Sequence, residues 1–187
     1  MKKRCSWVNL KNEKYILYHD LEWGKKIFDD KILFEMLTLE GAQSGLSWET
    51  ILSKRETYRE VFDFFDVKKI SNYDSKKIEK LLKNPGIIRN KLKINSVIKN
   101  AKVFLDIQNE FGSFSDYIWS FVNFETINNY IEKSKDAPAK TEISEKISKE
   151  LKKRGMSFVG PTIIYSFMQA VGMVNDHEND CFCKNIY

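Results

Sequence analysis

The stretch Leu81-Leu82-Lys83-Asn84-Pro85-Gly86-Ile87-Ile88-Arg89-Asn90-Lys91 decides the architecture that the sequence predicts. Pro85 and Gly86 favour a tight turn, and the apolar residues on both sides pin that turn to a core. Helical periodicity precedes and follows it, so we predict a hairpin between two helices. Backbone N–H groups at the start of the second helix could bind an anion such as a phosphate. Positive charge is added there by Lys83, Arg89, Lys91 and Lys93.

The helical pattern extends over the rest of the chain. A period of 3.6 residues recurs and no segment shows clean two-residue alternation, so we predict an all-α fold. Gly41 is expected to end the first helix, and residues 128–141 are expected to form a surface loop. The most apolar stretch, 162–174, is expected to be a central buried helix that Pro161 opens. The first helix is expected to follow Asp29-Asp30, and further helices are expected to start at Ser47, Asp66, Asp74, Lys91 and Ser115. Ile143, Ile147 and Leu151 mark one more amphipathic helix, which Gly155 is expected to end.

Length and composition indicate one globular domain, residues 1–187, with two helical lobes. The 187 residues carry 31 basic and 26 acidic side chains, a net charge of +5. This excess permits a nucleic-acid partner without requiring one, because a compositional bias toward lysine gives the same number. No apolar run reaches the roughly 20 residues of a membrane span, and no secretory signal is present. We therefore expect a cytoplasmic protein, and a monomer.

The histidines and cysteines gather at the two ends of the chain. Cys5 and His19 lie near the start, and His177 and Cys181 lie near the end, at a spacing that one tight turn brings together. Two thiolates and two imidazoles suit a closed, structural Zn²⁺ site that leaves no position for a catalytic water. Two alternatives stay open at this point. Cys183 competes as the fourth ligand, and the cysteines could instead be buried as small hydrophobes.

Glu40 occupies an unusual position for a carboxylate. It follows Leu33, Met36 and Leu37 at helical spacing, which carries it onto the apolar face of the first predicted helix. A buried carboxylate pairs with another group or has a raised pKa. The alternative is that Glu40 lies in the last helical turn and reaches into solvent.

Aromatic residues surround Glu40 and His19 in the sequence. The small-residue segment 41–47 ends on Trp48, and Trp7, Tyr18 and Trp23 lie close to His19. A carboxylate among aromatic faces suits a planar, cationic ligand, through ring stacking, cation–π attraction and opposite charge. Ordinary core packing is the alternative, because 13% of the residues are aromatic.

Ordered motifs place the sequence near a known family. They are Arg4-Cys5-x-Trp7, Tyr18-His19-Asp20-x-Glu22-Trp23-Gly24, Leu39-Glu40-Gly41-x-Gln43-x-Gly45-Leu46-Ser47-Trp48, Gly86-Ile87-Ile88-Arg89, Trp119-Ser120-Phe121-Val122-Asn123, Leu151-Lys152-Lys153-Arg154-Gly155-x-x-Phe158-Val159-Gly160, Tyr165-Ser166-Phe167-Met168-Gln169-Ala170 and Asn175-Asp176-His177. With these, the chain resembles the type I 3-methyladenine-DNA glycosylases, a bacterial branch of the helix-hairpin-helix glycosylases. The match runs nearly end to end, and only residues 128–141 match poorly.

The resemblance implies a role for each of these groups. It implies that Glu40 and Tyr18 hydrogen-bond the excised base and that the pocket is lined by Trp48, Trp7 and Trp23. Gly45 and Leu46 stand where the family's loop probes the gap left by a flipped nucleotide. The hairpin Pro85-Gly86-Ile87, with Arg89 beside it, would grip the DNA backbone. One zinc ion would be held by Cys5, His19, His177 and Cys181.

The sequence departs from the wider superfamily in one respect. It shows neither a hairpin lysine arranged as a nucleophile nor the Gly-Val-Asp segment that gives other members a catalytic aspartate, and we assign no role to Asp106. We therefore predict a monofunctional hydrolase without strand cleavage. It would flip 3-methyladenine from alkylated double-stranded DNA, read it in the Glu40 pocket, and release the free base by water attack on the sugar. An abasic site would remain.

Two other classes of function compete with this prediction. One is a zinc-stabilised protein that binds damaged DNA without cutting it, which would not need Glu40, Tyr18 and Trp48 together. The other is a zinc-dependent hydrolase, which requires an open position on the metal.

Overall fold

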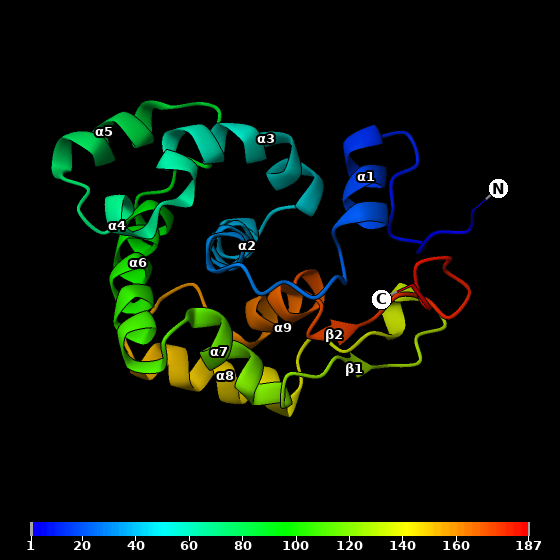
Figure 1. Ribbon diagram of the computed structural model, residues 1–187. Helices are drawn as coiled ribbons and strands as arrows, with labels where there is room; N and C mark the ends of the chain where they lie inside the picture. Colours follow the sequence, from blue (N-terminus) through cyan, green and yellow to red (C-terminus); the bar gives the residue numbers. More distant parts are fainter. Residues whose placement is uncertain (1, 187) are drawn as a thin grey trace.

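The computed structural model describes residues 2–186 and is mostly helical (Figure 1). Its α-helices are α1 (Glu13–Leu21), α2 (Asp30–Gln43), α3 (Trp48–Val61), α4 (Val67–Ile70), α5 (Ser75–Lys83), α6 (Lys91–Phe111), α7 (Phe114–Trp119), α8 (Glu142–Lys153) and α9 (Pro161–Ala170). Short 3₁₀ turns lie at Asp63–Phe65, Ser120–Val122 and Ser134–Asp136. Two strands of two residues each are β1 (Ile127–Asn128) and β2 (Val174–Asn175).

Helix α2 is the centre of the molecule. Figure 1 shows it end-on, with α3, α6 and α9 arranged around it, and it contacts each of these helices. Its residues from Leu33 to Ala42 are all buried, and the Phe34 ring packs edge-to-face on Phe104 of α6 at 5.1 Å. Burial on every side explains why α2 is apolar over most of its surface. The side chains between Leu33 and Ala42 are therefore closely packed.

Side-chain caps define most helix starts, as the sequence predicts. Asp29, Ser47, Asp66 and Asp74 each accept a hydrogen bond from the backbone N–H three residues ahead, at the starts of α2, α3, α4 and α5. Each such cap stabilises a helix by about 1 kcal/mol. Pro161 occupies the first position of α9, also as predicted, although α9 ends at Ala170 and not at 174. Helix α7 begins at Phe114, capped by Ser113, so the expected start at Ser115 is wrong by one residue.

Two further expectations are corrected by tertiary contacts. Gly41 does not end α2, which continues to Gln43. A Cβ at Gly41 would lie 3.3 Å from the Cβ and the carbonyl oxygen of Phe158, so glycine serves here for close packing. Helix α1 was not expected, because charged and apolar residues are not segregated along it. A partly buried ion-pair network joins its end to α2 and α3, with Arg55 donating to Glu22 at 2.7 Å and to Glu35 at 2.5 Å.

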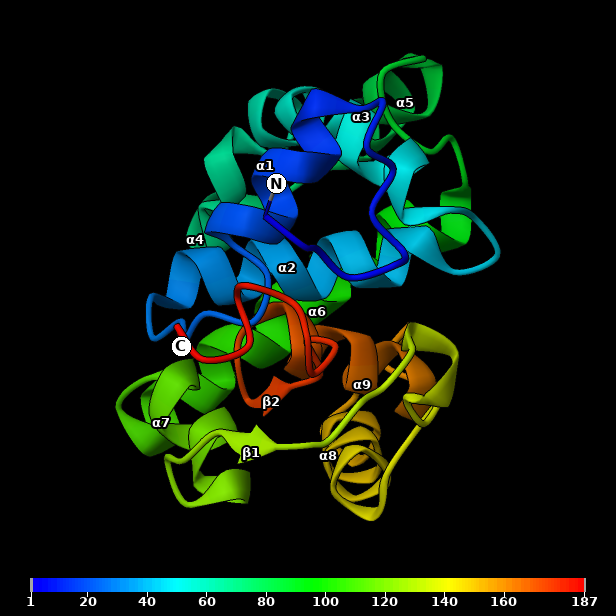
Figure 2. The same cartoon turned by 90° about the vertical axis from the view of Figure 1, so that its right-hand side faces the viewer.

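The two ends of the chain come together on one face of the molecule (Figure 2). The backbone N–H of Phe182 donates to the carbonyl oxygen of Lys3 at 2.9 Å. Strands β1 and β2 pair in parallel, with Ile127 opposite Val174, and an isolated bridge joins Ile131 to Glu178. These contacts hold the segment 129–141 against the C-terminal segment. Among the described residues, no helix has the length and apolarity that crossing a membrane demands.

Candidate active site and metal cluster

A cavity of about 270 Å³ lies where α1, α2, the start of α3, α9 and the segment 129–141 meet. It is slightly smaller than the roughly 300–1,000 Å³ of most small-molecule sites. Its lining residues are Trp7, Tyr15, Tyr18, Trp23, Glu40, Gln43, Trp48, Ser134, Ala137, Ser166, Gln169 and Asp176. The structure thus brings together all five residues predicted to hold the base.

Glu40 is buried at the wall of this cavity. The residue is 4% exposed, and its carboxyl has no hydrogen-bond or ionic partner among residues 2–186. Burial raises the pKa of the Glu40 carboxyl to about 8, because the anion is poorly solvated there. The alternative in which Glu40 reaches into solvent is therefore wrong. A buried carboxyl without a partner in the protein is poised to meet a polar or cationic ligand.

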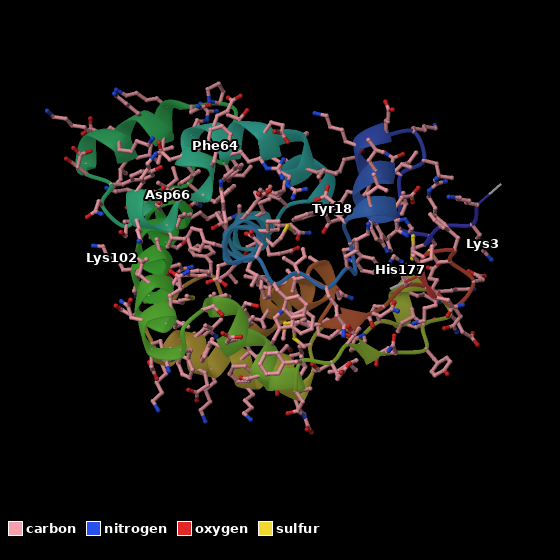
Figure 3. The ribbon with its side chains drawn as sticks, in the orientation of Figure 1. Lys3, Tyr18, Phe64, Asp66, Lys102 and His177 are labelled. Atoms are coloured by element: carbon pink, nitrogen blue, oxygen red, sulfur yellow. The ribbon has the colours of Figure 1, made fainter. Side chains whose placement is uncertain are left out.

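Aromatic rings form the remainder of this wall. The centroids of the Tyr18 and Trp48 rings are 5.2 Å apart, and those of Trp7 and Trp23 are 4.9 Å apart. Figure 3 shows Tyr18 between α1 and α2. Burial and the nearby Glu40 carboxyl raise the pKa of the Tyr18 hydroxyl, so this group stays protonated and can donate a hydrogen bond.

The rest of the cavity lining is mostly polar and was not expected from the sequence. Ser166 and Gln169 come from α9, Asp176 follows β2, and Ser134 comes from the segment 129–141. The available signal was the pair Ser166 and Gln169, two polar residues three positions apart on a mostly apolar helix. Ser134 belongs to a segment expected to be a mere surface loop. Its hydroxyl and backbone N–H donate to Glu178, which also accepts from Ser6.

Four buried side chains from the two chain ends form a cluster that could hold a metal ion. The donor atoms of Cys5, His19, His177 and Cys181 all lie within 4.8 Å of one another. Cys5 Sγ is 3.4 Å from His177 Nδ1, and Cys181 Sγ is 3.4 Å from His19 Nε2 and 3.6 Å from His177 Nδ1. Figure 3 shows His177 in the C-terminal segment, below α1. The competing ligand Cys183 lies outside this group and shares a second one with His19 and Asp20.

The second ring nitrogen of each histidine is oriented by a protein acceptor. His19 Nδ1 lies 2.7 Å from Asp20 Oδ1, and Arg4 in turn holds Asp20 through both of its carboxylate oxygens. His177 Nε2 lies 3.2 Å from the carbonyl oxygen of Trp23. Such outer partners fix the tautomer of metal-binding histidines. The Trp23 ring also packs on His177 at 4.6 Å, so the cluster supports the wall of the cavity directly.

The hairpin lies between α5 and α6, as the sequence predicts, but fewer of its N–H groups are available than expected. The N–H groups of Gly86, Ile87 and Ile88 already donate within the protein, to Asn84 Oδ1, the Asn84 carbonyl oxygen and Tyr58 Oη. The backbone N–H groups without an acceptor among residues 2–186 include those of Arg89, Lys91 and Leu92.

The positive charge of Lys93, which was expected to belong to the hairpin, is instead used inside the protein. Its ammonium donates to the carbonyl oxygens of Ala42 at 2.8 Å and Ser44 at 2.6 Å, where α2 ends. A cation at this end of a helix is stabilising. The adjoining turn presents Leu46, which is 41% exposed, after Gly45 in a left-handed conformation (φ +78°). Lys93 therefore supports the loop predicted to probe DNA.

Comparison with known proteins gives matches over nearly the whole chain. Residues 7–184 match the methyladenine glycosylase family. The DNA-3-methyladenine glycosylase of Haemophilus influenzae is 50% identical over 184 residues, which cover 98% of this chain and 99% of the relative. A crystal structure of 3-methyladenine DNA glycosylase I superimposes with a TM-score of 0.94 at 47% identity, covering 97% of this chain and 99% of that one. A tyrosine-to-phenylalanine variant of 3-methyladenine DNA glycosylase I in complex with 3-methyladenine gives a TM-score of 0.93 at 34% identity, covering 97% of both chains.

Proposed function

Because the chain belongs to the methyladenine glycosylase family, we propose that it excises 3-methyladenine from alkylated DNA by hydrolysis and leaves an abasic site. The observation that carries this proposal is the Glu40 carboxyl, buried and unpartnered in a cavity that is lined by aromatic rings. The site is built for a flat, cationic ring. A base methylated at N3 and still bound to its sugar is such a ring.

Recognition follows from the two charge states of Glu40. In the empty cavity the carboxyl holds its proton at neutral pH, because its pKa is about 8. A cationic base beside it favours the carboxylate, which then pairs with the positive ring and accepts from its exocyclic amine. Trp48 stacks on the base, and the Tyr18 hydroxyl donates to its edge. Trp7 and Trp23 close the remaining aromatic side. Plain adenine lacks the charge and gains less from this site.

Hydrolysis without strand cleavage is supported by the cavity lining. A lyase forms a covalent bond to the sugar through an amine. The described lining of this cavity includes no lysine, and the nearby Lys93 ammonium is held by two carbonyl oxygens at the end of α2. We therefore assign the chain as a monofunctional glycosylase in which water is the nucleophile.

The DNA-binding surface is proposed on two elements. The exposed Leu46, after Gly45, would fill the gap that the flipped nucleotide leaves in the duplex. The α5–turn–α6 segment would act as the helix-hairpin-helix, with Pro85, Gly86 and Ile87 against the backbone. The N–H groups at the start of α6 and the exposed Arg89 would face a phosphate.

We propose Zn²⁺ as the ion of the Cys5, His19, His177 and Cys181 cluster. Tetrahedral zinc with bonds of about 2.3 Å to sulfur and about 2.0–2.1 Å to nitrogen puts sulfur and nitrogen about 3.6 Å apart. The three S···N distances of 3.4, 3.4 and 3.6 Å fit this arrangement. Four protein donors fill the coordination sphere, so the ion would stabilise the fold and would not activate water. A zinc-dependent hydrolase is disfavoured on the same ground.

We further propose that residues 1–187 act as one cytoplasmic domain and as a monomer.

The direct test is chromatography of the bases that the purified protein releases from methylated duplex DNA. Free 3-methyladenine from the wild type, with strongly reduced release by Glu40→Gln, is the expected result. Full activity of Glu40→Gln would show that the role proposed for Glu40 in recognising the base is wrong. Retention of methylated and plain DNA alike, with no base released by the zinc-loaded protein, would instead identify a non-catalytic DNA-binding protein.

A further inference from the structure

The polar wall of the cavity contains a second buried carboxylate, Asp176, which the recognition of the base does not use. Asp176 is 4% exposed and lines the cavity together with Gln169. Tyr18, Glu40 and Trp48 line the same cavity from α1, α2 and the start of α3. We expect a ring held among the aromatic residues to direct its glycosidic bond away from them, toward the polar side chains or the solvent.

Asp176 is held by three hydrogen bonds. Its Oδ2 atom accepts from the Tyr165 hydroxyl at 2.7 Å and from Gln169 Nε2 at 2.7 Å. Its Oδ1 atom accepts from Asn129 Nδ2 at 2.8 Å. Lys184, which donates to the carbonyl oxygens of Asn129 and Asn175, supplies the opposite charge that interacts with this carboxylate. The position and orientation of the carboxylate are therefore fixed.

Asp176 and Gln169 each keep acceptor capacity that the protein does not use. A carboxylate offers about four lone-pair sites, and three of those on Asp176 are occupied, which leaves one on Oδ1. The amide nitrogen of Gln169 is turned toward Asp176, and its carbonyl oxygen has no donor among residues 2–186. Two neighbouring side chains of the cavity wall thus each keep one acceptor. Two adjacent acceptors are what a water molecule needs to donate both of its hydrogens.

We propose that Asp176 and Gln169 hold and activate the water that attacks the sugar, an inference that rests on the glycosylase function proposed above. The water donates one hydrogen to Asp176 Oδ1 and the other to the Gln169 carbonyl oxygen, so its lone pairs point into the cavity. Its oxygen forms a bond to the sugar C1′ as the C1′–N9 bond breaks. The electron pair of that bond stays on N9 and cancels the positive charge of the base. The proton lost by the water passes to Asp176 and from there to solvent.

The two carboxyl groups of the cavity have different surroundings and, in this proposal, different roles. Glu40, without partners, meets the charge of the base, and Asp176, fully oriented, serves the water. Glycoside hydrolases that use water directly likewise need a carboxylate base on the side away from the leaving group. A general base of this kind contributes about 10²–10⁴ to a rate. We expect the lower end here, because a cationic base is already a good leaving group.

The test compares Asp176→Asn with wild type in single-turnover excision of 3-methyladenine from methylated duplex DNA. We expect the excision rate to fall by about tenfold or more. Affinity for free 3-methyladenine and for DNA containing an abasic analogue should stay within about twofold, because neither involves the attacking water. Gln169→Leu should lower the same rate by a smaller factor. Formate added to Asp176→Ala should restore part of the rate.

Asn100→Asp is the matched control, because it makes the reverse exchange of amide and acid in a buried pair that does not line this cavity. It should lose stability and keep the excision rate of the folded protein. Wild-type excision by Asp176→Asn, or equal rate losses in Asp176→Asn and Asn100→Asp, would overturn the proposal. If Asp176→Asn does not fold, Gln169→Leu and the formate experiment decide in its place. Failure of the wild type to release base would count against the glycosylase function, not against this assignment alone.

Discussion

The Glu40 carboxyl links the stability of the protein to the ligand that the cavity accepts. Its pKa of about 8 in the folded protein compares with an ordinary value of 4.5. Below pH 4.5 the group is protonated in both the folded and the unfolded chain. Between these two values the unfolded chain releases the proton and the folded protein keeps it, so folding stability falls as pH rises. The empty active site is therefore less stable than the same fold without this carboxyl.

Glu40→Gln should stabilise the ligand-free protein increasingly between pH 5 and pH 8.5. The gain at the upper end should be about 4–5 kcal/mol, since the pKa rises from 4.5 to about 8 on folding and each pKa unit corresponds to about 1.4 kcal/mol. Urea unfolding at the two pH values measures it. Glu56→Gln, at an exposed residue of α3 that pairs with Arg59, controls for the loss of one negative charge. Parallel stability curves for wild type and Glu40→Gln would show that Glu40 is not buried in an ionisable form.

Trp48 provides a second test at the residue scale. Stacking of a base on an aromatic side chain contributes about 1–3 kcal/mol, so Trp48→Ala should weaken binding of free 3-methyladenine by roughly tenfold or more. Equilibrium dialysis measures this affinity. Leu46→Ala is the control, because Leu46 lies outside the cavity lining and should affect excision from duplex DNA but not binding of the free base. Equal affinity of wild type and Trp48→Ala for the free base would show that Trp48 does not stack on it.

At the scale of elements, the α5–turn–α6 hairpin depends on close packing against α3. A Cβ at Gly86 would lie 2.4 Å from Thr57 Cγ2, a distance that requires a shift. The Tyr58 hydroxyl and the Lys54 ammonium of the same helix also bind the hairpin, through the Ile88 N–H and the Pro85 carbonyl oxygen. The position of the hairpin is therefore a property of α3 as much as of the turn sequence.

Gly86→Ala should destabilise the protein by about 1–3 kcal/mol, the usual cost of overpacking, and should weaken DNA binding. Thr57→Ala removes the clashing methyl group, so the double variant Thr57→Ala with Gly86→Ala should recover most of both losses. Thermal unfolding and binding to an abasic duplex measure the two effects. Failure of the double variant to recover would mean that glycine is needed at position 86 for its backbone freedom and not for the space beside Thr57.

At the scale of the whole molecule, the metal cluster joins residues that are separated by most of the chain. An ion bound by all four residues would close this large loop and contribute on the order of 4–5 kcal/mol, by the chain-entropy treatment of cross-links. The ring and the carbonyl oxygen of Trp23 both contact His177, so we expect a bound ion to stabilise the aromatic wall of the cavity as well. Loss of the ion should therefore loosen the base site as well as the chain ends.

Zinc analysis of the purified protein should give one ion per chain, and Cys5→Ser with Cys181→Ser should give none. Removal of the ion by a chelator should lower the Tm by about 10 °C, since 1 kcal/mol corresponds to about 2–4 °C at this size. Cys183→Ser is the matched control and should keep both the ion and the Tm. Loss of zinc in Cys183→Ser would instead assign that thiol to the coordination sphere.

The sequence by itself determined the features that depend on neighbours along the chain. Caps such as Asp29 and Ser47, the Pro85-Gly86 turn and the placement of Glu40 on a buried helical face follow from local hydrogen bonds and helical spacing. The family motifs added the membership of the metal cluster, which spacing alone left open between Cys181 and Cys183. Tertiary structure alone decided that Gly41 continues α2 against Phe158, that Lys93 closes the end of α2, and that Asp176 and Gln169 share a cavity wall. These facts rest on contacts between residues far apart in sequence, and local propensity and periodicity carry no information about such contacts.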